Sequence, residues 1–212
     1  MTRRLHEARF EEQVTLEGFD FQASPKLPAA QIRDLAALRW LHAGESVILY
    51  GPAGVGESHV AQALGHLAIR HGADVRVLKT SRALAHLAGG HADHTWHKRL
   101  GELTRPAVLI LNDFAMRELT PGQADDLYEL ITERSGRSLV LTSNRAPQDW
   151  YPLFPQPRRR RVPARQGHQQ QPPALHERAQ LPPQKTTRPA CHHDREGGHA
   201  VEQNQARAWS IT

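Results

Sequence analysis

The sequence predicts an α/β fold in which helices cover both faces of a parallel sheet, and three observations lead to this prediction. First, short apolar runs typical of strands alternate along the chain with segments of helical periodicity. Second, these runs are nearly uninterrupted, as in strands that are covered on both faces. Third, the run 46–50 leads through a glycine-rich turn into the helical pattern 58–70, which is the arrangement of a phosphate-binding loop.

Strands and helices are predicted in order along the chain. A charged helical start precedes a helix over residues 29–41, which has one apolar face and Pro28 near its first turn. Strands are predicted at residues 46–50, 73–78, 106–111 and 138–142. Further helices are predicted at residues 58–70, 81–87 and 120–134. Gly89 and Gly90 are expected to end the helix 81–87, and the polar segment 91–103 is expected to be a solvated connector.

The turn after the first strand has the composition of a phosphate cradle. Glycines 51, 54 and 56 permit backbone angles that direct successive N–H groups inward, and the next helix adds the partial positive charge of its N-terminus. The Ser58 hydroxyl stands where it would bind Mg²⁺. The residues expected to contact ATP are Gly51, Pro52, Ala53, Gly54, Val55, Gly56, Glu57, Ser58 and His59.

Glu57 departs from the pattern of such loops, which have lysine in this position. A glutamate in the first turn suits the helix dipole, so the loop and the helix are expected to form. Beside the β- and γ-phosphates, however, the carboxylate replaces an attraction by a repulsion. At ~4 Å and an effective dielectric constant of about 20, each such interaction is worth roughly 4 kcal/mol. ATP and Mg²⁺ are therefore expected to bind weakly.

The second half of an ATPase site is predicted after the strand 106–111, where Asn112 and Asp113 follow. In this position a first acid holds Mg²⁺ and a second polarises the attacking water. Asn112 keeps an oxygen but lacks the charge, whereas Asp113 is retained. The predicted metal ligands are thus Ser58, Asn112 and Asp113. Asp113 and Asn144, which follows the strand 138–142, are the predicted catalytic residues, with little or no activity expected.

Composition differs between the two parts of the chain. Residues 155–212 carry ten of the 27 lysines and arginines but only four of the 22 acids, so residues 1–154 are nearly neutral. The basic tail, rich in Pro, Gln, Arg and His, is expected to be disordered, and its charge is poor evidence for nucleic-acid binding by the globular part. A single cysteine, no membrane-spanning apolar run and no signal peptide predict a soluble cytoplasmic protein.

Several segments of this sequence resemble the IstB family of transposition helper ATPases, which are AAA+ proteins similar to the DnaC helicase loaders. They are Phe19-Asp-Phe21, GPAGVGESHVAQALGH, VLILNDFAMREL, DDLYELITER and LTSNRAPQDWYPLF, within residues 4–155. The resemblance implies a five-stranded sheet with the phosphate-loop strand between the fourth and fifth strands. It also implies an ATP-dependent homo-oligomer on DNA that delivers a target site to a cognate transposase. By this resemblance, the chain is expected to begin inside the family pattern, without the helical segment that usually comes first.

The resemblance ends at Pro155. If residues 156–166 are back-translated with permitted codons and shifted by one base, they read Asn-Pro-Val-Val-Ala-Glu-Ser-Leu-Leu-Asp-Arg, which is similar to the family sequence. We therefore expect that one inserted base shifted the frame after Pro155. The last strand of the family would then be missing, and the strand 46–50 would be an open edge of the sheet.

The expected organisation is an N-terminal extension packing on the core (1–30), an incomplete AAA+ ATP-binding domain (31–154) and a disordered basic tail (155–212). The expected function is an ATP-binding helper of an insertion-sequence transposase, impaired in ATP binding and hydrolysis. One alternative is a non-hydrolysing remnant that acts as a DNA- or partner-binding module. The other is a DnaC-like helicase loader. A transposase reading frame immediately upstream would favour the helper over the loader.

Overall fold

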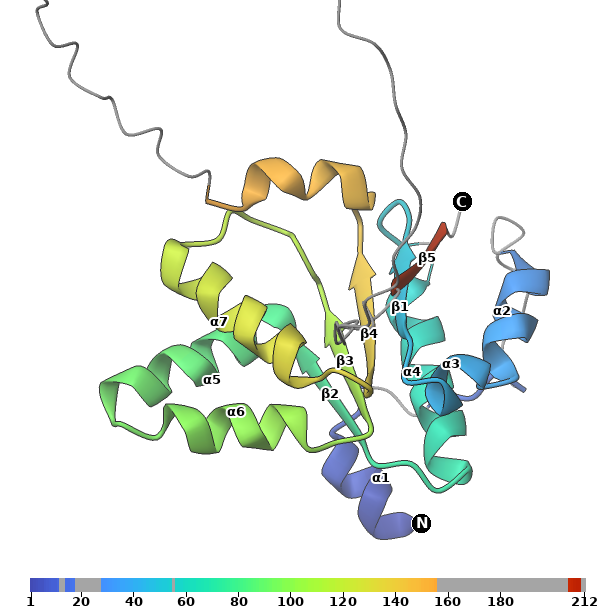
Figure 1. The fold of residues 1–212 in the computed structure, drawn as a ribbon. Coiled ribbons are helices and arrows are strands. Elements are labelled where there is room, and N and C mark those ends of the chain that lie inside the picture. The colour runs from blue at the N-terminus through green and yellow to red at the C-terminus, as the bar shows by residue number, and fades with distance from the viewer. Residues whose placement is uncertain (12–13, 18–27, 55, 156–205, 211–212) are drawn as a thin grey trace, which may run out of the picture. The chain divides into compact units, whose positions relative to one another are not determined.

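The computed structural model describes residues 1–11, 14–17, 28–54, 56–155 and 206–210 (Figure 1). Its helices are α1 (Thr2–Ala8), α2 (Ala29–Ala36), α3 (Arg39–His42), α4 (Glu57–Arg70), α5 (Thr80–Ala92), α6 (Trp96–Thr104) and α7 (Pro121–Glu133). Two short 3-10 helices, η1 (Pro147–Asp149) and η2 (Tyr151–Leu153), follow the fourth strand. The strands are β1 (Ser46–Tyr50), β2 (Val75–Lys79), β3 (Val108–Asn112), β4 (Ser138–Ser143) and β5 (Ala206–Ser210). The aromatic pair Phe19 and Phe21 lies outside the described residues.

The strands form one parallel sheet in the order β2-β3-β4-β1-β5. Figure 1 shows α2, α3 and α4 on one side of the sheet and α5, α6 and α7 on the other. Because side chains alternate across a strand, Val108 and Ile110 of β3 enter the core that includes α4. Leu109 and Leu111 enter the core formed with α5, α6 and α7. The predicted α/β class, with helices on both faces, is confirmed.

The expectation that the strand 46–50 is an open edge is wrong. β5 pairs in parallel with all of β1, from Ser46 opposite Ala206 to Tyr50 opposite Ser210. An edge strand with unpaired N–H and C=O groups is a template for a short extended segment. Composition alone assigns residues 206–210 to a disordered tail, because a five-residue strand carries little signal until the edge that it pairs with is known.

Removal of residues 206–212 is expected to expose the amides along one edge of β1, and only that edge, to hydrogen exchange. The Gly51 N–H donates to β4, so by alternation the N–H groups of Ile48 and Tyr50 face β5. In the truncated chain we expect the amides of Ile48 and Tyr50 to exchange faster, while the β1 amides that face β4 stay protected. Amide exchange followed by NMR measures this difference. Unchanged protection at both positions would show that β5 does not cover the edge.

The N-terminal residues pack on the α4 side of the sheet. Ala8 is fully buried, and Leu5 and Phe10 contact the same core. The helix predicted over residues 29–41 is divided into α2 and α3 by Leu38, which is buried with a φ of 55°. This break allows the buried Trp40 to donate its Nε1–H to a carbonyl of α2 at 2.9 Å. Among the described helices, none is long and apolar enough to cross a membrane.

Helices α5 and α6 differ from the sequence expectation. α5 continues through Gly89 and Gly90, and most of the segment 91–103 is helical rather than a connector. A Cβ on Gly90 would lie 2.7 Å from the Cα of Trp96, and one on Gly89 would lie 2.6 Å from the Arg99 guanidinium. Gly90 therefore allows the backbone of α6 to approach α5 closely, and neither glycine ends the helix.

Candidate nucleotide-binding site

The phosphate loop joins β1 to α4, as the sequence predicts. Gly54 and Gly56 have φ angles of 88° and 106°, a region that residues with a side chain seldom adopt. The same expectation for Gly51 is wrong, because its φ is not positive. Its N–H instead donates to the Ser143 carbonyl at 3.2 Å and fixes the start of the loop against β4.

A cavity of about 170 Å³ lies where the loop meets the carboxyl ends of β3 and β4. It is lined by Ala53, Gly54, Glu57, Ser58, Asp113, Met116, Thr142, Ser143 and Asn144. The structure thus brings together residues that the sequence predicts from three separate segments. Complete small-molecule sites usually have about 300–1,000 Å³, so this cavity is of a size for the phosphate end of a nucleotide.

Several predicted residues lie outside this cavity. Gly51, Pro52, Gly56, His59 and Asn112 do not line it, and Val55 is not among the described residues. Asn112 is 2% exposed, and its Oδ1 accepts a hydrogen bond from the Thr142 hydroxyl at 3.2 Å. Its amide nitrogen is buried without a hydrogen-bond partner. An aspartate in this position would present an acceptor where the asparagine leaves a donor unpaired.

Glu57 is buried in the wall of the cavity, with 8% of its surface exposed. Its Oε1 is buried and has no hydrogen-bond partner. Burial raises the pKa of the Glu57 carboxyl, and the backbone N–H groups of Glu57 and Gly56 partly offset that rise. These N–H groups belong to the predicted phosphate cradle. A charged Glu57 would therefore repel a phosphate and also interact with the donors that the phosphate needs.

Asp113 also lines the cavity and has an unusual backbone conformation, with a φ of 57°. Its N–H donates to the Thr142 hydroxyl at 3.3 Å, and its carboxylate forms an ion pair with Lys79 Nζ at 3.2 Å. Sequence reasoning missed Lys79. The signal that could have found it is its place at the end of β2, because the carboxyl ends of parallel strands meet at one edge of the sheet.

The loop and the side chains around it differ in how well they fit ATP and Mg²⁺. The backbone of the loop fits a phosphate group, because Gly54 and Gly56 adopt the angles of a cradle at the start of α4. The Ser58 hydroxyl and the Asp113 carboxylate are oxygen ligands of the kind that Mg²⁺ prefers. The Glu57 side chain does not fit a bound phosphate.

This fold, with a phosphate loop and a carboxylate after a neighbouring strand at one edge of a parallel sheet, is that of a phosphate-loop nucleotide-binding protein. The fold is similar to a crystal structure of the DnaC helicase loader, with a TM-score of 0.51 and 20% identity over 69% of this chain and 81% of that chain. The family model of IstB-like ATP binding proteins matches residues 1–159. The chain belongs to that family.

Two relatives illustrate the match. An ATP-binding protein of an insertion sequence from Mycobacterium tuberculosis is 65% identical over 159 residues, which are 74% of this chain and 63% of the relative. The insertion sequence IS21 ATP-binding protein from Pseudomonas aeruginosa is 34% identical over 155 residues, which are 73% of this chain and 58% of the relative. The family match ends at residue 159, close to the departure predicted after Pro155. The frame shift itself stays a prediction.

Proposed function

We propose that this chain is a helper protein of an insertion-sequence transposase with a weakened ATP site. Family membership supports the helper role, since both relatives described above are named as ATP-binding proteins of insertion sequences. The observation that carries the weakening is Glu57, which lies buried in the cavity wall beside the phosphate cradle. At an effective dielectric constant of about 20, a carboxylate ~4 Å from a phosphate charge costs roughly 4 kcal/mol before relaxation.

Each residue of the site has a proposed role. We propose that the backbone from Gly51 to Gly56 and the first turn of α4, which includes His59, surround the phosphates. Ser58 and Asp113 hold Mg²⁺, and Asn112 contributes through the hydrogen bond to Thr142. Asp113 polarises the attacking water, and Asn144 contacts the γ-phosphate. Lys79 orients the Asp113 carboxylate through their ion pair.

Restoring the lysine alone is not expected to restore hydrolysis. In Glu57→Lys we expect phosphate release close to background, because Asn112 lacks the charge that helps to fix Mg²⁺. The double variant Glu57→Lys/Asn112→Asp should exceed the single variant. The original frame after Pro155 is expected to be needed for full turnover, since segments that follow in the family are replaced here. Rapid, Mg²⁺-dependent phosphate release from the single variant would contradict the expectation that Asn112 and the segment after Pro155 also limit hydrolysis.

The partners proposed for the chain are DNA, further copies of itself and a cognate transposase. Sedimentation of the full chain with duplex DNA tests the helper role directly. ATP-dependent assembly on DNA is expected for Glu57→Lys and not for the unchanged chain. If Glu57→Lys binds ATP but does not assemble on DNA, the chain is better described as a remnant that no longer acts as a helper.

A further inference from the structure

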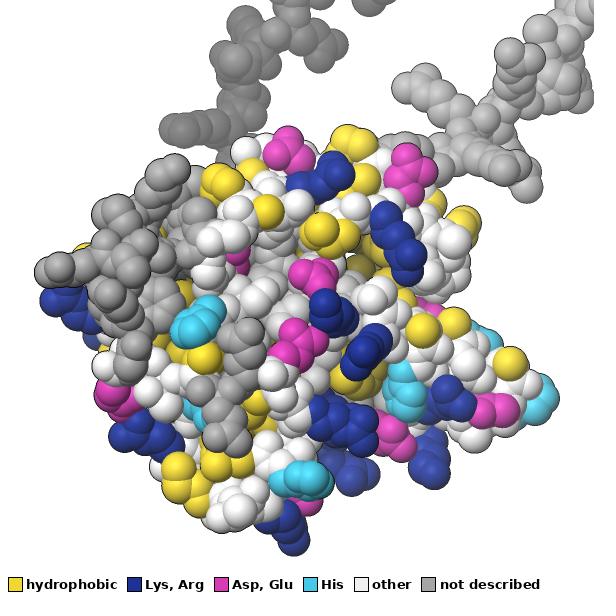
Figure 2. Space-filling model, turned by 180° about the vertical axis from the view of Figure 1, so that it is seen from behind, with side chains coloured by type: hydrophobic (Ala, Val, Ile, Leu, Met, Phe, Trp, Pro, Cys, Tyr) yellow, Lys and Arg dark blue, Asp and Glu magenta, His cyan; other side chains and the backbone are white. Residues whose placement is uncertain are grey.

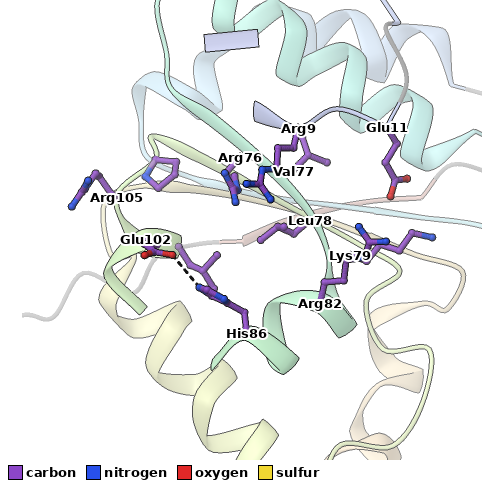
Figure 3. A pocket seen from close by; sticks show the side chains of 12 residues that line it. Arg9, Glu11, Arg76, Val77, Leu78, Lys79, Arg82, His86, Glu102 and Arg105 are labelled. Atoms are coloured by element: carbon purple, nitrogen blue, oxygen red, sulfur yellow. Dashed lines mark hydrogen bonds and ion pairs between the residues drawn. The ribbon is translucent and has the colours of Figure 1, made fainter. Parts of the chain in front are cut away.

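A second cavity, of about 600 Å³, lies along the outer edge of β2 (Figure 3). The strand borders it with residues 76–79, α5 and α6 contribute His86 and Glu102, and the segment after α1 contributes Arg9. None of the residues that line it lines the nucleotide cavity. Its volume is within the range of about 300–1,000 Å³ that is typical of ligand sites.

β2 is an edge strand of the described sheet, and half of its backbone groups point away from β3. The Val108 N–H donates to the Asp74 carbonyl at 3.0 Å, so by alternation the N–H and C=O groups of Val77 and Lys79 face outward. Within the described part of the chain no other strand pairs with this edge. Such an edge can accept an added strand from another chain.

Positive charge is concentrated around this edge. Four arginines line the cavity: Arg9, Arg76, Arg82 and Arg105. Of the two acids that line it, Glu102 already pairs with His86 at 3.1 Å. Figure 3 shows the Arg9 and Arg76 side chains next to each other, and burial, together with the charge of Arg9, lowers the pKa of Arg76. In Figure 2, Lys and Arg side chains gather in the middle and lower middle of the molecule, with acidic and histidine side chains between some of them.

Three of these four arginines are available to bind an anion, whereas Arg76 already donates to the Glu7 carbonyl at 3.2 Å. Among the described residues, the side chains of Arg9, Arg82 and Arg105 form no ion pair. The cavity is not purely polar, because Leu78 and Leu103 also line it. A ligand that satisfies the whole site must therefore carry negative charge, an apolar group and backbone donors and acceptors.

We propose that the β2 edge binds an acidic, extended peptide segment of a partner protein, which pairs with Val77 and Lys79 as an added strand. Its carboxylates bind the arginines, and an apolar side chain two residues away, on the same face of the added strand, contacts Leu78. A nucleic-acid strand would match the arginines, but it would leave the strand edge and the apolar surface unused. The proposal is independent of ATP binding and goes beyond the helper function.

A synthetic seven-residue peptide of sequence Glu-Glu-Val-Val-Glu-Glu-Val, which places both kinds of side chain on each face of an added strand, tests this inference on the full chain. NMR-monitored titration is expected to give saturable binding, with new protection of the Val77 and Lys79 amides from exchange. The amides of Arg76 and Leu78, which face β3, should be protected with and without the peptide. N-methylation of the peptide nitrogens that face β2 removes donors without changing charge, and it should weaken binding at least tenfold.

Charge variants separate this site from general electrostatic attraction. Arg82→Glu/Arg105→Glu should weaken peptide binding at least tenfold. Arg33→Glu/Lys98→Glu makes the same change in net charge with exposed residues outside the cavity, and it should have little effect. Equal weakening in both double variants would overturn the proposal. Tighter binding of a thymidine oligonucleotide than of the peptide at this site, or no protection of Val77, would also overturn it. The arginines would then be a nucleic-acid contact or a guard of the edge against aggregation.

Discussion

Replacing Glu57 by lysine is expected to raise the affinity of this chain for ATP by at least tenfold. The substitution removes a buried carboxylate from the cavity wall and adds an attraction to the phosphates. Tenfold corresponds to about 1.4 kcal/mol, which is well below the several kcal/mol that the Coulomb estimate allows. Titration with a fluorescent ATP analogue measures the change. Equal affinities of the two proteins would show that Glu57 does not oppose nucleotide binding.

The pH dependence of binding provides a control within the same experiment. Burial raises the pKa of Glu57, so lowering the pH neutralises the carboxyl earlier than an ordinary glutamate. ATP should therefore bind the unchanged chain more tightly as the pH falls through the pKa of Glu57. Glu57→Gln removes the titrating group at nearly constant size and should not show this increase. Any contribution from protonation of ATP itself is common to both proteins.

Replacing Arg134 by methionine is expected to lower the free energy of unfolding by about 3–5 kcal/mol. Arg134 is 1% exposed. Its Nη1 donates to the carbonyls of Leu103, Thr104 and Pro106, and its Nη2 donates to those of Ala107 and Ser138. One side chain thus joins the end of α6 to the starts of β3 and β4. Its loss would leave several buried acceptors unpaired.

The Arg134 guanidinium keeps its positive charge although it is buried. Desolvation, with a smaller contribution from Arg137, lowers its pKa to about 10, so the guanidinium remains protonated at neutral pH. Arg137 is a matched control, because it is exposed and donates to one carbonyl, that of Thr104, at 2.7 Å. Arg137→Ala should cost less than about 1 kcal/mol. Denaturant unfolding compares the two variants, and similar losses would contradict the special role of Arg134.

Much of the fold and of the site could be predicted from the sequence because the responsible patterns are local. Four apolar runs indicate four strands wherever they pack, and Gly54 and Gly56 indicate a backbone turn that few other residues can make. The capping box that starts α7 is also a local pattern, because Thr120 and Gln123 are only three positions apart. The expected weakening of ATP binding also follows from one residue, because Glu57 places a negative charge where such loops have lysine.

Tertiary structure decided the features that depend on residues far apart in the chain. The pairing of β5 with β1 joins segments 160 positions apart, and no local pattern indicates it. Lys79 meets Asp113 only because β2 and β3 end at the same edge of the sheet. Gly89 and Gly90 look like a helix end until α6 is seen to pack on them. The preference of a short segment for helix, strand or turn contributes little free energy. Burial of side chains and pairing of backbone groups contribute more, so these tertiary contacts override the local preference.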